Sequence, residues 1–251
     1  MASSDQIAAV AAANQQRHLA ANAYPGRGLI LGRSADGAAW LQVYWIMGRS
    51  ENSRNRRFVV DGASMRTEAV DPSKLRDPTN VIYEAMLELP DLYVVANGDQ
   101  SRTIVDALAS GGGFEEALET REREDDAPNY TPRISGLLDL RGRTHGAEPR
   151  VAISILRAND ADASQSDRVT TRPALPPGGY GLGITTYAGD GDPLPAYRGD
   201  PLWLPLSGGA GHVLATYWEA LNAENRVALA VKSIPIDGGP GSILVRNAHE
   251  A

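Results

Sequence analysis

Two apolar segments separated by Asp36-Gly37 constrain the fold of this chain more than any other feature. Residues 28–48, GLILGRSADGAAWLQVYWIMG, are largely apolar on both sides of that pair, and residues 57–70, RFVVDGASMRTEAV, repeat the arrangement around Asp61-Gly62. An Asp-Gly pair between strand-forming runs is a strong signal for a tight hairpin. The sequence therefore predicts two antiparallel hairpins in its first third.

Further strands are predicted on both sides of a central helical segment. They are expected at residues 80–89, 91–98, 134–142, 150–158, 180–189, 226–236 and 242–248. Residues 101–124, broken by Gly111-Gly112-Gly113, and residues 211–222 predict helices, whereas residues 159–179 and 190–205 predict loops. Strands from both ends of the chain, with helices grouped between them, predict an α+β fold with antiparallel sheets.

The N-terminal residues are expected to form a helix that is retained in the protein. They lack a basic segment followed by an unbroken apolar run, so we do not interpret them as a signal peptide. The longest apolar runs are also far shorter than the roughly 20 residues that a membrane helix needs. We therefore expect a cytoplasmic protein with no membrane partner.

Composition excludes several classes of site. The chain has no cysteine, and its four histidines are scattered without metal-ligand spacing, so we expect neither a metal nor a thiol nucleophile. A net charge of −7 and a pI near 5.1 argue against a general nucleic-acid binder. Any anion must therefore be recognised locally.

One short segment concentrates positive charge in this acidic chain. Residues 47–58, MGRSENSRNRRF, hold four arginines interleaved with Ser and Asn. Such a segment is either a solvated loop or an anion site, because guanidinium groups bind phosphate in a bidentate manner. Strand alternation would place Arg54 and Arg56 on one side and Arg57 on the other, where it would pair with surface acids.

Four segments lie where a predicted strand meets a loop, which is a common location for a site held by a rigid scaffold. They are residues 24–32, 47–58, 94–101 and 122–136. In this order they resemble the archaeal-type IMP cyclohydrolase family, and their wording resembles its bacterial branch. The resemblance is carried by Tyr24-Pro-Gly-Arg27, Arg49-Ser50, Asn55-Arg56, Tyr83, Ala96-Asn97-Gly98, Glu124 and Thr131-Pro-Arg-Ile-Ser-Gly136.

The resemblance covers residues 24 to about 140 well and TTYAGDGDPLP more loosely. It implies a four-layer αββα sandwich of antiparallel sheets, like the N-terminal-nucleophile hydrolases but without self-processing. It also implies one domain over residues 24–251, preceded by a helical extension at residues 1–23 that has no counterpart in the family. We further expect a homo-oligomer, since enzymes of this size often form closed symmetric assemblies.

The implied reaction is the closure of 5-formamidoimidazole-4-carboxamide ribonucleotide (FAICAR) to IMP with loss of water, without a cofactor. The resemblance implies that Arg49 stabilises the formyl oxyanion, that Tyr83 donates a proton, and that Glu124 accepts a proton or orients the carboxamide. Glu122 is an equally placed alternative to Glu124, and Tyr83 is otherwise a half-buried core tyrosine. The resemblance implies a purine ribonucleotide as the partner.

The same resemblance implies a set of substrate ligands, with Arg54, Asn55 and Arg56 interpreted as phosphate or ribose ligands. The set is Arg27, Ser50, Arg54, Asn55, Arg56, Asn97, Gly98, Asn129, Thr131 and Arg133. Asn97 is otherwise a turn residue, and Arg133 otherwise braces its loop. Two alternative functions stay open: an enzyme of the same fold acting on a related nucleotide in a specialised pathway, and a non-catalytic nucleotide-binding protein.

Overall fold

The computed structural model describes residues 4–75, 78 and 81–250, which form two antiparallel sheets and a small number of helices. Residues 1–3 of the predicted N-terminal extension and Ala251 at the end of the predicted domain lie outside the described residues. The predicted start of the 80–89 strand at Asn80 lies outside them as well. The predicted α+β class with antiparallel sheets is confirmed.

The first sheet has six strands in the order β11-β10-β1-β2-β12-β13. Their bounds are β1 (Gly28–Arg33), β2 (Ala39–Met47), β10 (Tyr180–Thr185), β11 (Leu202–Pro205), β12 (Arg226–Pro235) and β13 (Ser242–Asn247). Strands from both ends of the chain therefore pair in one sheet. Asp36 helps to close the β1–β2 hairpin by accepting a hydrogen bond from Ala38 N at 3.0 Å, and Gly37 takes a φ of +71° there.

The second sheet has seven strands in sequential order, from β3 to β9. Their bounds are β3 (Arg56–Asp61), β4 (Ser64–Ala69), β5 (Glu84–Leu89), β6 (Leu92–Ala96), β7 (Arg133–Asp139), β8 (Arg150–Ala158) and β9 (Ser166–Thr171). Gly62 has a φ of +58° in the β3–β4 turn, as the second Asp-Gly hairpin predicts.

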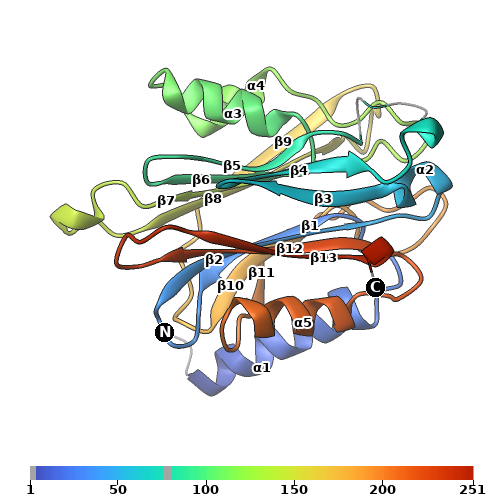
Figure 1. The fold of residues 1–251 in the computed structure, drawn as a ribbon. Coiled ribbons are helices and arrows are strands. Elements are labelled where there is room, and N and C mark those ends of the chain that lie inside the picture. The colour runs from blue at the N-terminus through green and yellow to red at the C-terminus, as the bar shows by residue number, and fades with distance from the viewer. Residues whose placement is uncertain (1–3, 76–77, 79–80, 251) are drawn as a thin grey trace.

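Helices cover the outer faces of both sheets (Figure 1). The helices are α1 (Ser4–Gln15) with a π-helical continuation at Gln16–Ala20, α2 (Glu51–Arg54), α3 (Gln100–Ala109), α4 (Phe114–Glu119) and α5 (Ala210–Ala220). Helices α3 and α4 lie over the seven-stranded sheet, and α1 and α5 lie under the six-stranded sheet. The predicted N-terminal, central and C-terminal helices are therefore present.

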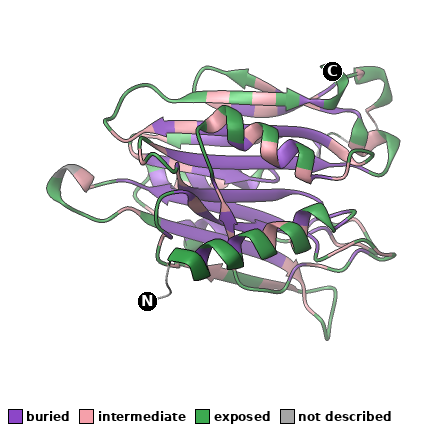
Figure 2. Cartoon of the chain, turned by 90° about the horizontal axis from the view of Figure 1, so that it is seen from below, coloured by how far each residue is buried: buried purple, intermediate pink, exposed green. Residues whose placement is uncertain are grey.

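The main core lies between the two sheets. Figure 2 shows buried residues concentrated along the strands, with exposed residues on the helices and connecting loops. Leu29 and Leu31 of β1 lie against Gly136 of β7, which has no side chain and lets the sheets approach closely. A second apolar cluster, which includes Ile104 and Phe114, fills the space between α3, α4 and the seven-stranded sheet.

Two strands lie where the sequence predicts loops. Strand β9 falls within residues 159–179 and β11 within residues 190–205, so both loop predictions are wrong at these positions. Strand β9 is a sheet edge with no fully buried residue, and therefore lacks an apolar pattern. Strand β11 has only four residues, follows Pro201 and ends at Pro205, although Leu202 and Leu204 are buried in alternation. No helix in the described part of the chain is long and apolar enough to span a membrane.

Gly28 provides a test of how tightly the sheet packs beside β1. A Cβ atom at Gly28 would lie 1.9 Å from Cζ2 of the buried Trp45, its cross-strand partner. We expect Gly28→Ala to lower the free energy of unfolding by about 1–3 kcal/mol, because overpacking forces neighbours to move. Urea unfolding would measure this change.

The matched control is Gly211→Ala in α5, where the nearest atom to the new Cβ is Leu244 Cδ1 at 4.0 Å. We expect no loss of stability for this variant, because alanine favours helix over glycine. Equal unfolding midpoints for Gly28→Ala and wild type would contradict the packing described for β1.

Candidate functional site

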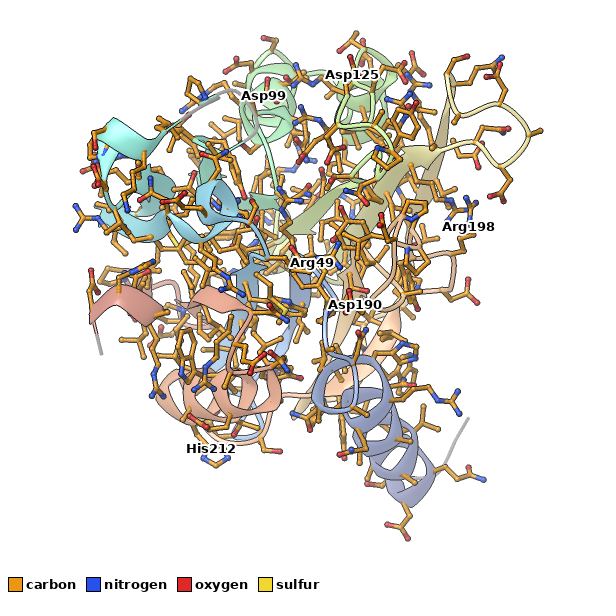
Figure 3. The ribbon with its side chains drawn as sticks, turned by 90° about the vertical axis from the view of Figure 1, so that its right-hand side faces the viewer. Arg49, Asp99, Asp125, Asp190, Arg198 and His212 are labelled. Carbon is orange, nitrogen blue, oxygen red and sulfur yellow. The ribbon has the colours of Figure 1, made fainter. Side chains whose placement is uncertain are left out.

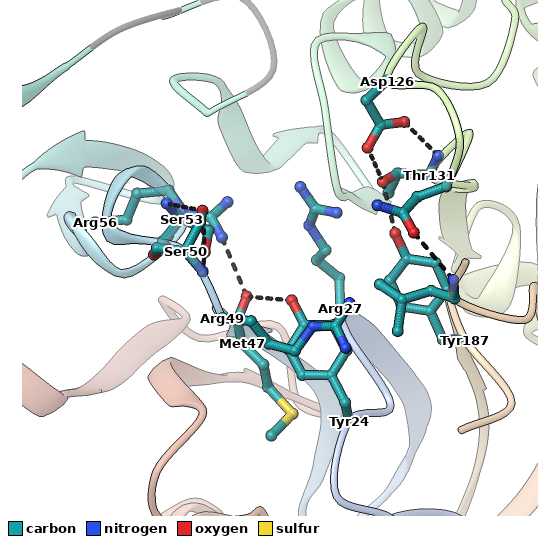
Figure 4. Close-up of a pocket in the computed structure, with 12 residues that line it drawn as sticks. Tyr24, Arg27, Met47, Arg49, Ser50, Ser53, Arg56, Asp126, Thr131 and Tyr187 are labelled. Carbon is teal, nitrogen blue, oxygen red and sulfur yellow. Dashed lines mark hydrogen bonds between the residues drawn. The ribbon is translucent and has the colours of Figure 1, made fainter. Parts of the chain in front are cut away.

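A cavity of about 200 Å³ opens where β1 begins, β2 ends and three loops meet. Figure 3 faces this end of the molecule, with Arg49 and Asp190 near its centre, and Figure 4 shows the cavity itself. Its lining residues are Tyr24, Arg27, Met47, Arg49, Ser50, Ser53, Arg56, Asp126, Asn129, Thr131, Tyr187 and Leu194. Six of them, namely Arg27, Arg49, Ser50, Arg56, Asn129 and Thr131, belong to the predicted site.

One wall of the cavity is built by the end of β2, α2 and the start of β3. Ser50 caps α2 through a reciprocal capping box with Ser53. Arg56, the first residue of β3, is fully buried and donates from Nε to Ser53 O at 2.8 Å and from Nη2 to Met47 O at 3.2 Å. Its Nη1 has no hydrogen-bond partner in the part of the chain that the structure describes. This wall therefore offers a fixed guanidinium and two hydroxyl groups.

Arg27, which lines the cavity, forms a buried pair with Glu124, which lies behind the cavity surface. Arg27 Nη2 lies 3.6 Å from Glu124 Oε2, and the two side chains are 10% and 3% exposed. The backbone N of Glu124 donates to Thr131 O at 2.9 Å, which holds the main chain at Glu124 in place. Arg27 Nε and Glu124 Oε1 have no hydrogen-bond partner among the described residues. Buried charged atoms are rarely left unpaired, so these atoms indicate a place for a polar ligand.

The Glu124 carboxyl has the electrostatics of a proton-transfer group. Burial raises the pKa of Glu124 above its ordinary value, against the opposing effect of Arg27, and the Asp126 carboxylate adds to the rise. A carboxyl whose pKa moves toward neutrality exchanges protons more effectively in catalysis. Glu122, the alternative in the sequence, is instead exposed and ion-paired with Arg168.

Tyr83 lies in the layer behind the cavity wall. Its hydroxyl is 2.7 Å from the hydroxyl of Tyr44, and both side chains are buried. Burial, followed by the neighbouring Tyr83, raises the pKa of Tyr44 well above its ordinary value. Tyr83 is close enough to Arg27 to interact with its charge, but neither Tyr83 nor Glu124 lines the cavity surface.

Arg49 is the one predicted catalytic residue that lines the cavity. Its guanidinium lies over the ring of Tyr24 at 4.9 Å from the centroid. Nη1 contacts Asp190 Oδ1 at 2.5 Å and Gly191 O at 3.2 Å. With 37% of its side chain exposed, Arg49 is positioned at the mouth and not in the buried base.

The opposite wall consists of neutral and acidic groups. Asp126 accepts hydrogen bonds from Thr131 N at 2.6 Å and from Thr131 Oγ1 at 2.5 Å, and Thr131 Oγ1 is 2.6 Å from Tyr187 OH. The Tyr187 ring stacks on that of Tyr24, with centroids 5.9 Å apart. Asn129 Oδ1 accepts from Leu194 N at 3.0 Å. Figure 4 shows this wall and the Arg56 wall on either side of Arg27.

Arg54 does not share a side with Arg56, so the prediction from strand alternation is wrong here. Arg54 ends α2, where alternation does not apply, and donates to Gly48 O at 2.9 Å and Asn225 Oδ1 at 3.2 Å outside the cavity. Arg57 pairs with Glu68 at 2.8 Å, as predicted. A role for Arg54 in binding a ligand stays a prediction.

Four further predicted ligands lie away from the cavity lining. Asn55 bonds the backbone of Asp71, with both distances 2.8 Å. Asn97 is fully buried and bonds Pro132 O at 2.8 Å and Ile134 N at 2.7 Å, so its amide holds the loop before β7. Their roles toward a ligand stay predictions.

Arg133 contacts Asp99 at 2.7 Å and Gln100 at 2.9 Å beside Gly98, whose missing side chain leaves room for the guanidinium. Arg133 therefore ties the start of β7 to the start of α3, and its charge also acts on the Glu124 carboxyl group. Gly98 contributes space in this arrangement, and the roles of both residues toward a ligand stay predictions.

The sequence interpretation did not select several residues of the lining. Ser53, Asp126 and Tyr187 line the cavity but were not predicted as site residues. Asp126 lies in the acidic run EREDD, which by itself is typical of a solvated helix end. Tyr187 lies in TTYAGDGDPLP, far along the chain from the arginine-rich segment.

A comparison with protein families identifies the family to which this chain belongs. The model of the IMP cyclohydrolase-like protein family matches residues 24–238, which include every predicted site residue and the whole cavity lining. The chain belongs to the IMP cyclohydrolase-like family. The resemblance expected from the sequence is thereby confirmed.

A curated relative supports the same assignment. The chain is 35% identical over 120 residues to the IMP cyclohydrolase of Methanopyrus kandleri. That alignment covers 46% of this chain and 59% of the relative, so the chain spans less than two thirds of that enzyme. The IMP cyclohydrolase-like match begins at Tyr24, which leaves α1 and its continuation outside the matched region.

Proposed function

We propose that the chain is an IMP cyclohydrolase that closes FAICAR to IMP with loss of water. The observation that carries this proposal is the buried charged set Arg27, Arg56 and Glu124, each of which retains one polar atom without a partner. A solvated surface loop would leave such groups exposed to water. Membership of the IMP cyclohydrolase-like family makes a purine ribonucleotide the ligand that fits this set.

The two walls suit the two ends of such a substrate. The phosphate dianion would bind at the wall of Ser50, Ser53 and Arg56, because guanidinium and hydroxyl donors match phosphate oxygens. The imidazole with its two amide groups would lie toward Thr131 and Tyr187. This orientation keeps the phosphate away from the Asp126 carboxylate.

Ring closure needs help at three points. The carboxamide nitrogen attacks the formyl carbon, so both groups must be held in a near-attack geometry. Developing negative charge on the formyl oxygen needs fixed donors, for which Arg27 and the predicted Arg49 are candidates. One proton must leave the carboxamide nitrogen, for which Glu124 is the candidate base, and a second must leave the formamide nitrogen. The formyl oxygen takes up two protons and departs as water, with Tyr83 as the candidate donor of one of them.

The finer features of the fold and setting belong to the same proposal. We propose that the two sheets with their outer helices form an αββα sandwich of the N-terminal-nucleophile-hydrolase type, without self-processing. A single domain at 24–251 after an extension at 1–23, a homo-oligomer and a cytoplasmic location complete the proposal. The layered arrangement in Figure 1 supports the sandwich.

A turnover assay without added cofactor tests the function. Purified protein mixed with FAICAR should form IMP, followed by the purine absorbance, and Arg57→Ala should behave as wild type because Arg57 pairs with Glu68 outside the cavity. Saturable IMP binding without turnover of FAICAR would instead favour a relative with another substrate or a nucleotide-binding protein. Absence of both turnover and binding would refute the proposal.

A further inference from the structure

In the wall formed by Asp126, Thr131 and Tyr187, the hydrogen bonds that join these three side chains run in one fixed direction. Asp126 as a carboxylate can only accept hydrogen bonds, so the contact of 2.5 Å between its Oδ2 and Thr131 Oγ1 must use the hydroxyl hydrogen of Thr131. A threonine hydroxyl has one hydrogen. The contact of 2.6 Å between Thr131 Oγ1 and Tyr187 OH must therefore use the hydrogen of Tyr187.

Tyr187 is consequently left with lone pairs and no hydrogen to offer to a ligand. It lines the cavity, and its ring is held by stacking on Tyr24. Burial raises the pKa of Tyr187, so the hydroxyl stays protonated and the direction of the hydrogen bonds is preserved at neutral pH. The backbone N of Thr131 donates to Asp126 Oδ1 at 2.6 Å, which fixes the carboxylate at the far end of these hydrogen bonds.

We propose that Tyr187 selects the ligand by accepting a hydrogen bond from the nitrogen that becomes N1 of the purine, and that Asp126 sets this polarity through Thr131. The assignment of the ligand rests on the proposed function. The carboxamide nitrogen carries hydrogen both in FAICAR, as NH₂, and in IMP, as N1–H. The other amide nitrogen loses its hydrogen on ring closure, so it cannot offer the same contact in the product.

The proposal makes Tyr187 a specificity residue and Asp126 a positioning residue that acts through Thr131. Asp126→Asn would reverse the direction of these hydrogen bonds. The asparagine Oδ1 would still accept from Thr131 N, while the asparagine NH₂ group would donate to Thr131 Oγ1. Thr131 would then donate to Tyr187, and Tyr187 would donate into the cavity.

The test compares IMP with purine riboside 5′-monophosphate. IMP has an N1–H donor and a 6-oxo group, whereas purine riboside 5′-monophosphate has an N1 acceptor and no 6-oxo group, so the change in their affinity ratio between variants is the readout for N1. Calorimetric dissociation constants would be measured for wild type, Asp126→Asn, Tyr187→Phe and the double variant. We expect Asp126→Asn to shift the ratio of the two constants toward the purine nucleotide by about tenfold or more, because unpaired buried polar groups are costly.

The double variant makes the test specific. In the Tyr187→Phe background, Asp126→Asn should leave the ratio of the two constants unchanged, since no hydroxyl remains to be reoriented. Thermal unfolding of each variant would confirm a folded protein, and Tyr187→Phe supplies an independent loss of selectivity if Asp126→Asn does not fold. An equal loss of affinity for both nucleotides in Asp126→Asn, or the same shift with and without Tyr187, would overturn the proposal.

These outcomes are separate from those of the turnover assay. A reversed preference in a protein that does not close FAICAR would support the role of Tyr187 and refute the cyclohydrolase function. Rapid ring closure with an unchanged ratio in Asp126→Asn would support the function and refute the role of Tyr187.

Discussion

Replacement of Glu124 by glutamine is expected to lower the turnover of FAICAR by about 10²- to 10⁴-fold, the usual contribution of a positioned general acid or base. The side chain keeps its size and its place beside Arg27, but it can no longer accept a proton. The binding of IMP should change much less than turnover. Steady-state kinetics and IMP titration on the same preparation would measure the two effects.

The pH dependence of kcat/KM provides a second readout for Glu124. A general base works in its ionised form, so the rate should fall as pH decreases through the pKa of the carboxyl group. Because burial raises the pKa of Glu124, this acid limb should lie at higher pH than that of an ordinary glutamate. The limb should disappear from the residual activity of Glu124→Gln.

Glu122→Gln is the matched control for this experiment. Glu122 lies two residues earlier in the same run, is exposed, and pairs with Arg168. Its replacement should leave both turnover and the acid limb as in wild type. A large loss in Glu122→Gln, or near-normal turnover in Glu124→Gln, would show that Glu124 is not the base.

Most strands and helices could be predicted because short sequence segments determine them. The two Asp-Gly pairs specify the β1–β2 and β3–β4 turns, and long apolar runs specify the central strands. Strand β9 was not predicted because an edge strand with neither face buried has no apolar periodicity. Such a strand is defined by its pairing with β8, which is a property of the assembled sheet.

The cavity lining was predictable where one segment contributes several lining residues, and less so where distant segments meet. Residues 47–58 supplied Arg49, Ser50 and Arg56 to the cavity, as their composition suggested. Tyr187 reaches it through the contact with Thr131, 56 positions away in the sequence. Arg54 lies outside the cavity and Arg56 lines it because α2 ends at Arg54 and β3 begins at Arg56. The sequence pattern did not predict this boundary.

That difference makes Arg54 and Arg56 a matched pair for locating the phosphate. Arg56→Lys is expected to raise KM for FAICAR and Kd for IMP by about tenfold to 100-fold, because a charged hydrogen bond to a buried guanidinium is lost and lysine cannot reproduce its planar geometry. Arg54→Lys should stay near wild type if the contacts of Arg54 with Gly48 O and Asn225 outside the cavity are its whole role, whereas a similar rise in KM would support the predicted role of Arg54 as a ligand.

Inosine, which lacks the phosphate, separates phosphate binding from a general disturbance of the cavity. If Arg56 binds the phosphate, wild type should prefer IMP to inosine strongly, and Arg56→Lys should lose most of that preference while retaining its affinity for inosine. A loss of affinity for both ligands would mean that Arg56 only supports the wall through Ser53 O and Met47 O. Because interactions equal in ground and transition states change KM and not kcat, a phosphate ligand distant from the reacting amides should leave kcat largely unchanged.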